Sequence, residues 1–344
     1  MERIDCQMAE VLHGFYTMVK ELSDKTDLTD PGSPEPEMEI LVAEKAGFCL
    51  GVERALNMVM SAVKDESKAI YTYGPLIHNP QVVKYLESLG VKVASSIDEI
   101  PQGSRVVIRS HGIGPAERKI IDEREFEVID ASCMFVVKAQ RMVSELYDEG
   151  YTILILGLKE HPEVKALNEY ANHEALIAGS LDELPNFDPP PEKLGVICQT
   201  TLNTEFFEQA IKRLRAQVPN LVVRNTICDA TNKRQKAARD IATEVDAMIV
   251  IGGYQSSNTR KLTDICRDRG VDTYHIETPK ELKKGWFIGR SRIGVTAGAS
   301  TPDWMIEEVI RAIQDFGFKR REASYPVKSK GSGNTECDLE GGQD

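Results

Sequence analysis

The amino-acid sequence predicts an α/β protein made of three similar units, each with a mainly parallel sheet. Two observations predict this class. Short apolar runs of strand length alternate with longer segments of helical periodicity along most of the chain. Three cysteines also occupy comparable places, each between a strand-like run and a helical one. We expect a pseudo-threefold arrangement, because equivalent side chains of three units can meet only near such an axis.

The strand-like runs are apolar, rich in β-branched residues and too short to be helices. Clear examples span residues 106–108, 153–156, 248–251 and 293–295. Helical periodicity covers residues 136–147, 204–215 and 303–313, where apolar side chains recur every three or four positions. This alternation predicts parallel strands that are joined by crossover helices.

The two ends of the chain differ from its body in composition. Residues 5–22 have the periodicity of one amphipathic helix, and residues 23–39 have the proline-rich, acidic composition of a linker. The first 39 residues hold ten acids and three bases, and residues 331–344 hold four acids and no base. We therefore expect an N-terminal extension at 1–39, three units at 40–132, 133–225 and 226–325, and a disordered acidic tail at 326–344.

Charge and composition argue against several classes of function. The chain has 42 Lys and Arg against 54 Asp and Glu, a net charge of −12, which argues against binding nucleic acid. No apolar run approaches the roughly 20 residues that a membrane helix needs. No signal or transit peptide is visible, so we expect a cytoplasmic protein with no membrane partner. Seven cysteines without a CxxC pair argue against a disulfide scaffold and a zinc ribbon.

A threefold repeat becomes visible when the cysteines are used as reference points. Cys49, Cys133 and Cys228 are 84 and 95 residues apart. A polar loop follows each cysteine after 28 or 29 residues, at His78, His161 and Ser256. A second polar loop follows in each unit, at residues 109–112, 199–201 and 298–300. We expect most of these loops at the carboxyl ends of strands, where open α/β sheets place their sites.

Three equivalent thiols favour a metal centre, because iron–sulfur clusters take cysteine ligands. Three ligands instead of four leave one iron open to a substrate, which is typical of a catalytic site. The alternative is that these cysteines are small buried apolar residues at strand ends. That interpretation suits the other four: Cys6 and Cys337 lie in the terminal extensions, while Cys198 and Cys266 fall on apolar patterns.

The polar loops supply donors that suit a phosphate or diphosphate. Several of them precede helices, whose free backbone N–H groups attract anions. Helix capping is the alternative role for each serine or asparagine taken alone. The run at Gly252-Gly253 lacks the dinucleotide fingerprint, so NAD binding is not supported. The candidate side chains are His78, His111, His161, Glu163, Thr200, Thr201, Ser256, Ser257, Asn258 and Ser300.

These residues and their surroundings resemble one known family, the IspH/LytB reductases that act on 4-hydroxy-3-methylbut-2-enyl diphosphate. The similar segments occur in family order over about residues 40–325. They are Gly47-Phe-Cys-Leu-Gly-Val52, Ile77-His-Asn79, Ser110-His-Gly112, Asp130-Ala-Ser-Cys133, His161-Pro-Glu-Val164, Gln199-Thr-Thr-Leu202, Cys228-Asp-Ala-Thr-Asn-Lys-Arg-Gln235, Ser256-Ser-Asn258 and Gly294-Val-Thr-Ala-Gly-Ala-Ser300.

The resemblance implies three α/β domains around one [4Fe–4S] cluster with one open iron, held by Cys49, Cys133 and Cys228. It implies reductive removal of the allylic hydroxyl, which gives isopentenyl and dimethylallyl diphosphate in the last step of the non-mevalonate isoprenoid pathway. Reduced ferredoxin or flavodoxin is the implied electron donor. Glu163 and Thr200 would deliver a proton. The implied substrate-binding residues are His78, His111, His161, Thr201, Ser256, Ser257, Asn258 and Ser300.

Two features depart from the family pattern: Met134 follows the second cysteine where many members have proline, and the acidic extension 1–39 has no counterpart in it. Two other functions remain open. One is another open-iron catalyst of quinolinate-synthase type, and the other is an iron–sulfur sensor without catalysis. A substrate with carboxylates favours arginine forks, and these loops offer only Arg109. A sensor has no need for a proton source such as Glu163 and Thr200.

Overall fold

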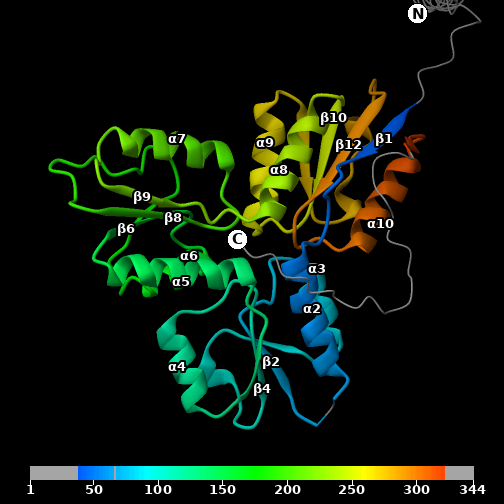
Figure 1. Ribbon diagram of the computed structural model, residues 1–344. Coiled ribbons are helices and arrows are strands. Elements are labelled where there is room, and N and C mark those ends of the chain that lie inside the picture. The colour runs from blue at the N-terminus through cyan, green and yellow to red at the C-terminus, as the bar shows by residue number, and fades with distance from the viewer. Residues whose placement is uncertain (1–37, 66, 322–344) are drawn as a thin grey trace, which may run out of the picture. The chain divides into compact units, whose positions relative to one another are not determined.

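The structure, a computed structural model, describes residues 38–65 and 67–321. The helix expected at 5–22, most of the linker and the acidic tail at 326–344 lie outside these residues. The predicted α/β class is confirmed: all ten strand pairings of the described residues are parallel, and they form three sheets (Figure 1).

Two sheets are built from consecutive strands, and the third combines the first described strand with the last four. The first sheet contains β2 (Ile70–Tyr73), β3 (Lys92–Ala94), β4 (Arg105–Ile108) and β5 (Glu127–Asp130), in the order β3-β2-β4-β5. The second contains β6 (Thr152–Leu156), β7 (Leu176–Ala178), β8 (Leu194–Cys198) and β9 (Leu221–Arg224), in the order β7-β6-β8-β9. The third contains β1 (Glu39–Val42), β10 (Ala247–Ile251), β11 (Asp272–Ile276), β12 (Arg292–Ala297) and β13 (Lys319–Arg320), in the order β11-β10-β12-β1-β13.

Each unit uses the same sequence of elements, beginning with a helix that starts just after a cysteine. In the first unit this helix is α2 (Leu50–Val63), followed by α3 (Pro80–Ser88) and α4 (Pro115–Glu123). The second unit has α5 (Met134–Asp148), α6 (Pro162–Glu169) and α7 (Thr204–Arg215). The third has α8 (Asp229–Ala242), α9 (Ser257–Asp268) and α10 (Asp303–Gln314). Short 3₁₀ turns lie at Ile97–Glu99, Pro279–Glu281 and Lys284–Trp286.

One strand is placed differently from the predicted division of the chain. The segment at Glu39–Val42 spans the predicted boundary between the extension 1–39 and the unit 40–132, but as β1 it pairs with β12 and β13 of the third sheet. In Figure 1 the blue β1 lies beside the orange β12. It fills the place that β5 and β9 fill in the other two sheets. The start of the described chain therefore completes the last unit, while the predicted unit boundaries themselves stay predictions.

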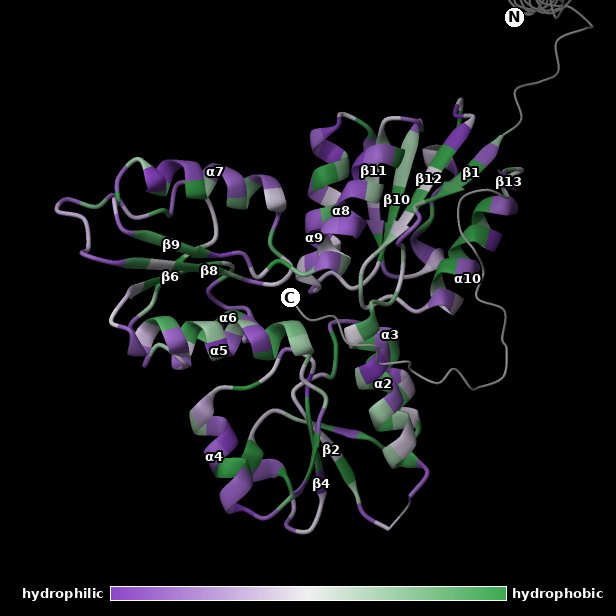
Figure 2. Ribbon diagram, viewed as in Figure 1, coloured by the Kyte–Doolittle hydropathy of each residue, from purple (hydrophilic) through white to green (hydrophobic). Residues whose placement is uncertain are grey.

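Apolar packing explains why helices cover both faces of every sheet. In the first sheet α2 and α3 pack on one face and α4 packs on the other. In the second sheet α5 and α6 share a face opposite α7, and in the third α8 and α9 share a face opposite α10. Strands covered on both sides must be apolar on both sides, and β4, β8 and β10 are buried along their whole length. Figure 2 shows these strands mostly green among helices that are purple on their outer sides.

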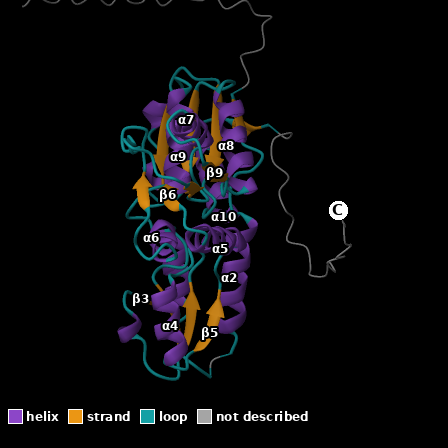
Figure 3. Ribbon diagram, turned by 60° about the vertical axis from the view of Figure 1, so that its left-hand side comes forward, coloured by secondary structure: helices purple, strands orange, loops and turns teal. Residues whose placement is uncertain are grey.

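The individual elements agree with the sequence periodicity. The segment predicted as a helix at 204–215 is α7, and those at 136–147 and 303–313 fall inside α5 and α10. The four predicted strand runs lie within β4, β6, β10 and β12. Figure 3 shows the alternation of helix and strand from the side. Among the described residues, no helix combines the length and the apolar character needed to cross a bilayer.

The position of β1 predicts the effect of trimming the N-terminus. Ile40, Leu41 and Val42 are almost fully buried, and each contributes about 1.5–3 kcal/mol through burial. We expect deletion of residues 1–37 to leave the melting temperature unchanged, and deletion of residues 1–42 to prevent the third sheet from folding. Circular dichroism melting and the fluorescence of Trp286 and Trp304, which lie beside that sheet, measure this. Equal melting temperatures for the two truncations would contradict the role of β1.

Candidate active site

All thirteen candidate residues line one cavity, at which loops and helix starts of the three units converge (Figure 1). The enclosed volume of this cavity is about 100 Å³. The structure thus brings together every residue that the repeat singled out. The candidates are Cys49, Cys133, Cys228, His78, His111, His161, Glu163, Thr200, Thr201, Ser256, Ser257, Asn258 and Ser300.

The three thiols enter the cavity at helix starts. Cys49, Cys133 and Cys228 are the N-cap residues of α2, α5 and α8. The Cys49 Sγ accepts a hydrogen bond from the Val52 N–H at 3.5 Å, and the Cys228 Sγ accepts one from the Thr231 N–H at 3.3 Å. Burial raises the pKa of Cys133 and of Cys228, and the proximity of the other thiols raises that of Cys133 further. A raised pKa favours the neutral thiol. If these side chains are to be thiolates together, a cationic centre beside them must stabilise their charge.

A glycine keeps the space between two of these thiols open. A Cβ atom at Gly51 would lie 2.8 Å from the Cys133 Sγ and 3.9 Å from the Cys49 Sγ. Any larger residue in this position would push into the sulfur atoms. The donor set of three thiols and the space beside them both fit an iron–sulfur centre with three cysteine ligands.

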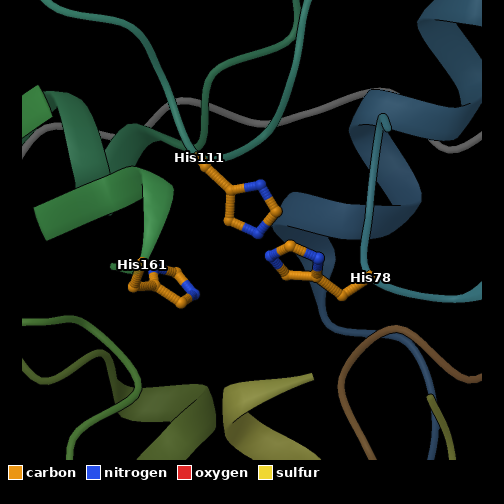
Figure 4. Close-up of side chains that lie close together, drawn as sticks. All are labelled: His78, His111 and His161. Atoms are coloured by element: carbon orange, nitrogen blue, oxygen red, sulfur yellow. The ribbon is translucent and has the colours of Figure 1, made fainter. Parts of the chain in front are cut away.

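Three histidines from two different units lie close together in the lining of the same cavity (Figure 4). The ring centroids of His78 and His111 are 4.4 Å apart, and His161 lies 5.6 and 5.4 Å from them. One ring nitrogen of each lies within 4.8 Å of the others. Burial lowers the pKa of His78 to about 4 and that of His161 to about 3, and it lowers the pKa of His111 as well. All three rings are consequently neutral at pH 7 without a ligand.

Several buried polar atoms around the histidines have no partner among the described residues. They are the Nε2 of His78, the Nδ1 of His111, and both side-chain polar atoms of Asn258. The Nδ1 of His161 accepts from the Glu163 N–H at 3.2 Å, which leaves its Nε2 as the protonated nitrogen. Buried polar groups without partners are rare and costly. These atoms can pair with a polar ligand in the cavity.

Glu163 is the only carboxylate among the described residues that line the cavity. Its side chain is 1% exposed. The backbone N–H of Thr200 donates to its Oε1 at 2.7 Å, and the Thr200 hydroxyl donates to its Oε2 at 2.9 Å. Burial raises the pKa of Glu163 to about 7, although these two hydrogen bonds act in the opposite direction. A carboxyl group with this pKa is partly protonated at neutral pH and can donate a proton.

The third unit closes the cavity with hydroxyl groups. Ser256 is the N-cap of α9, where its side chain accepts from the Thr259 N–H. The Ser300 hydroxyl donates to the backbone carbonyl of His78 at 3.3 Å. A Cβ atom at Gly253 would collide with that same carbonyl oxygen, so glycine is needed where the two loops touch. These contacts hold the His78 loop of the first unit against the third.

Three further residues lie in or beside the cavity, although they were not among the predicted binding or catalytic residues. The Gln199 amide donates to the hydroxyls of Thr201 and Ser257 at 2.8 and 3.1 Å, which joins the second unit to the third. Arg234 lines the cavity and donates to the Gly47 carbonyl at 2.8 Å. The charge of the largely buried Arg109 helps to keep the pKa of His78 low. Gln199 and Arg234 both belong to motifs already quoted, but Arg234 stands in a charged run typical of an exposed helix face.

The remaining described cysteines lie away from the cavity. Cys198 and Cys266 are fully buried in the apolar cores of the second and third units. Neither of them lines the cavity. Their packing role, which the sequence indicated, agrees with this placement. Cys6 and Cys337 lie outside the described residues.

Comparisons with known proteins point to one family. The family model described as LytB protein matches residues 40–314. A relative from Geobacter sulfurreducens, named 4-hydroxy-3-methylbut-2-enyl diphosphate reductase, is 46% identical over 284 residues, which cover 83% of this chain and 100% of the relative. The solved reductase from Plasmodium falciparum, described as acting on E-1-hydroxy-2-methyl-but-2-enyl-4-diphosphate, has a TM-score of 0.79 at 29% identity and covers 83% of this chain and 92% of its own.

A second solved structure is described as (E)-4-hydroxy-3-methyl-but-2-enyl diphosphate reductase, the terminal enzyme of the non-mevalonate pathway. It is 42% identical to this chain, with a TM-score of 0.60, and the match covers 81% of this chain and 99% of the other. The similarity therefore spans nearly the whole length of these relatives. With the family model matched over residues 40–314, these comparisons show that the chain belongs to the LytB family.

Proposed function

We infer that this protein removes the allylic hydroxyl group of 4-hydroxy-3-methylbut-2-enyl diphosphate by reduction, giving isopentenyl and dimethylallyl diphosphate as the last step of the non-mevalonate pathway. Membership of the LytB family and the names of its relatives support this activity. The observation that carries it is the buried Glu163–Thr200 pair, which faces the same cavity as three thiols and three neutral histidines.

The thiols of Cys49, Cys133 and Cys228 would hold a [4Fe–4S] cluster. When bound, such a cluster supplies electrons one at a time and keeps one iron free of protein ligands. The three helix N-termini around the sulfurs stabilise the negative charge of thiolates. The absence of a side chain at Gly51 also supports a cluster at this place, because it leaves room next to two of the three sulfur atoms.

The diphosphate would lie among His78, His111, His161, Ser256, Asn258 and Ser300, with Ser257 and Thr201 at its edge. The unpaired atoms of His78, His111 and Asn258 would then gain partners. Three imidazole nitrogens within 4.8 Å also suit a transition metal, but the surrounding hydroxyl and amide groups complement an anion better. Arg109 adds a positive charge close to His78 without touching the ligand site directly.

Glu163 would act as the proton source. Hydroxide is a poor leaving group, so the departing oxygen must receive a proton to leave as water. The Thr200 hydroxyl, 2.9 Å from the Oε2 of Glu163, can accept the carboxyl proton while passing its own proton into the cavity. This arrangement separates the proposed function from its two alternatives. A sensor needs no acid. Arg234, the one arginine among the described residues that line the cavity, already donates to two backbone carbonyls, so it is a poor fork for a substrate with several carboxylates. The cytoplasmic location and the ferredoxin or flavodoxin donor stay predictions.

A direct test measures the reaction with a chemical reductant. Anaerobically purified protein should be brown and should oxidise reduced methyl viologen only when the allylic diphosphate is added. Viologen oxidation that is independent of the diphosphate would contradict the proposed function.

The first prediction concerns the cluster ligands. Cys49→Ser, Cys133→Ser and Cys228→Ser should each lower the iron content per chain and the visible absorbance of the anaerobic protein. Cys266→Ala is the matched control, because its side chain is buried in the core of the third unit. A fully loaded and active Cys133→Ser protein would be incompatible with the assignment.

The second prediction concerns the diphosphate site. Asn258→Ala removes two unpaired buried atoms that we assign to the ligand, and it should weaken diphosphate binding by about 1–3 kcal/mol. Asn57→Ala on the exposed face of α2 is the control. Calorimetric titration with the diphosphate, the monophosphate and the free alcohol should give affinities that fall in that order. Equal affinities for the three compounds would rule out a diphosphate pocket.

The third prediction concerns the acid. Glu163→Gln keeps the shape of the side chain but loses its transferable proton, so kcat should fall by roughly 10²–10⁴. Because only the protonated carboxyl donates, the kcat of the parent should decrease as pH rises through about 7. The variant should lack this pH dependence while its cluster spectrum and diphosphate affinity stay normal. A variant with parental turnover would show that the proton has another source.

A further inference from the structure

The threefold repeat contains a second regular feature, which the proposed chemistry does not use. A basic residue follows each of the three cavity cysteines after exactly five positions: Arg54, Lys138 and Lys233. Each lies one turn into the helix that its cysteine begins, and all three are exposed. Since the whole chain carries a net charge of −12, a basic residue at the same place in every unit indicates a role on the surface around the thiols.

Large apolar side chains stand on the same helix starts. Leu50, directly after Cys49, is 83% exposed, and Met134, directly after Cys133, is 73% exposed. Val137, one turn further along α5, is 47% exposed. Figure 2 shows the N-terminal end of α5 in green, in contrast to its more purple far end. Burial in the core does not explain these residues, and exposed apolar clusters with a polar rim often mark interaction sites.

The two helix starts lie against each other. A Cβ at Gly51, next to Leu50, would touch the sulfur of Cys133, the neighbour of Met134. The Arg54 guanidinium donates to the backbone carbonyl of Ser132 at 3.0 Å. In Figure 3, α8, α5 and α2 follow one another down the same side of the described chain. We call this surface the thiol face and define it by Leu50, Arg54, Met134, Val137, Lys138 and Lys233.

The helix starts around the thiol face carry charges of both signs, and the basic residues stand at corresponding positions of the three helices. Glu53 and Asp229 stand in the first turns of α2 and α8, and α5 has no acid in its first turn. The three basic residues outnumber these two acids, and the three helix N-termini add positive potential. A partner with an acidic rim and a small apolar centre therefore complements this surface.

We propose that the thiol face is the docking site for an acidic one-electron carrier protein, an inference that rests on the proposed function. Replacing an allylic hydroxyl by hydrogen consumes two electrons and two protons and releases one water. Each carrier molecule is oxidised by one electron, so a carrier must dock twice in every turnover. Electron transfer weakens steeply with distance, and Leu50 and Met134 are the exposed residues directly bonded in sequence to two of the three thiol residues.

A carrier that must leave after each electron needs a weak interface that forms quickly. Opposite charges on the rims accelerate such encounters, and salt weakens their effect. An apolar centre the size of three side chains is small compared with the interfaces of permanent complexes. The basic residues at corresponding positions of α2, α5 and α8 would attract the acidic carrier from all three units.

The experiment compares two reductants on the full-length, cluster-loaded protein. The test variant is the double substitution Lys138→Glu and Lys233→Glu, which spares Arg54 because that side chain also holds the loop before Cys133. The control is Lys119→Glu with Lys212→Glu, an equal charge change on α4 and α7, which lie on the opposite sheet faces from α2 and α5. Reduced methyl viologen, a small molecule, delivers electrons without docking, whereas a reduced acidic flavodoxin must dock.

With flavodoxin at low salt, the test variant should lose about tenfold or more in kcat/KM for the carrier, and its dependence on salt should flatten. Its turnover with viologen should stay within about twofold of the parent, as should both activities of the control. Equal flavodoxin kinetics in the test and control variants would overturn the proposal. A parallel loss with viologen would also overturn it, because the substitutions would then act on the site itself.

The acidic segment at residues 1–37 is the competing occupant, and its deletion decides between the two. On our proposal, deletion leaves the parent's flavodoxin kinetics and the defect of the test variant unchanged. A marked rise in flavodoxin-driven turnover after deletion, together with loss of that defect, would assign the thiol face to the segment and refute carrier docking. If the parent shows no viologen turnover, the proposed function fails. Docking is still tested in that case, by titrating flavodoxin onto the loaded parent and test variant.

Discussion

In a parallel sheet, the residues that follow each strand lie at the same edge of the sheet. In this chain three such edges face one another. Everything at the cavity depends on this constraint. The cysteines at positions 49, 133 and 228 each follow a strand and begin a helix, so their sulfurs, their backbone N–H groups and the positive helix ends arrive together. No single unit holds a complete site. The histidines come from the first two units, the acid from the second and the serines from the third.

The site that we propose for the diphosphate is lined mainly by neutral groups, and this composition has an energetic consequence. Unpaired buried atoms such as those of Asn258 cost about 1–3 kcal/mol each in the free protein. This cost is recovered only when a ligand pairs them, so binding should stabilise the fold as well as position the substrate. The same desolvation keeps the imidazoles neutral and the Glu163 carboxyl partly protonated near neutral pH. Burial thus sets the protonation states of both the histidines and Glu163.

The sequence could predict the site because its signal repeats. A lone histidine or serine says little, but polar loops at 28 or 29 residues after each cysteine can hardly arise from capping alone. The spacing pointed to the loops that begin at His78, His161 and Ser256, while the roles of the candidate residues stay predictions. The helices followed from apolar periodicity in the same way, as α7 shows most clearly.

What the sequence could not predict depends on contacts between distant segments. The apolar residues of β1 indicate a strand, but nothing local shows that its partner is β12, some 250 residues away. Arg234 stands between lysine and glutamine, a pattern typical of a solvent-facing helix. It is buried because the Gly47 carbonyl lies over α8 and accepts its hydrogen bond. Both features arise from the closure of the three units on one another.

The pairing of the first described strand with the last ones constrains the order in which the newly synthesised chain can fold. β1 leaves the ribosome before any other described strand, while its neighbours β12 and β13 are made last. Until those strands are made, the apolar residues of β1 have no pairing partner. An exposed, unpaired strand of this kind promotes aggregation. The first two sheets can form as they are synthesised, since all their strands are consecutive in the chain. The cavity draws residues from all three units, so it can be completed only after the third unit has been made.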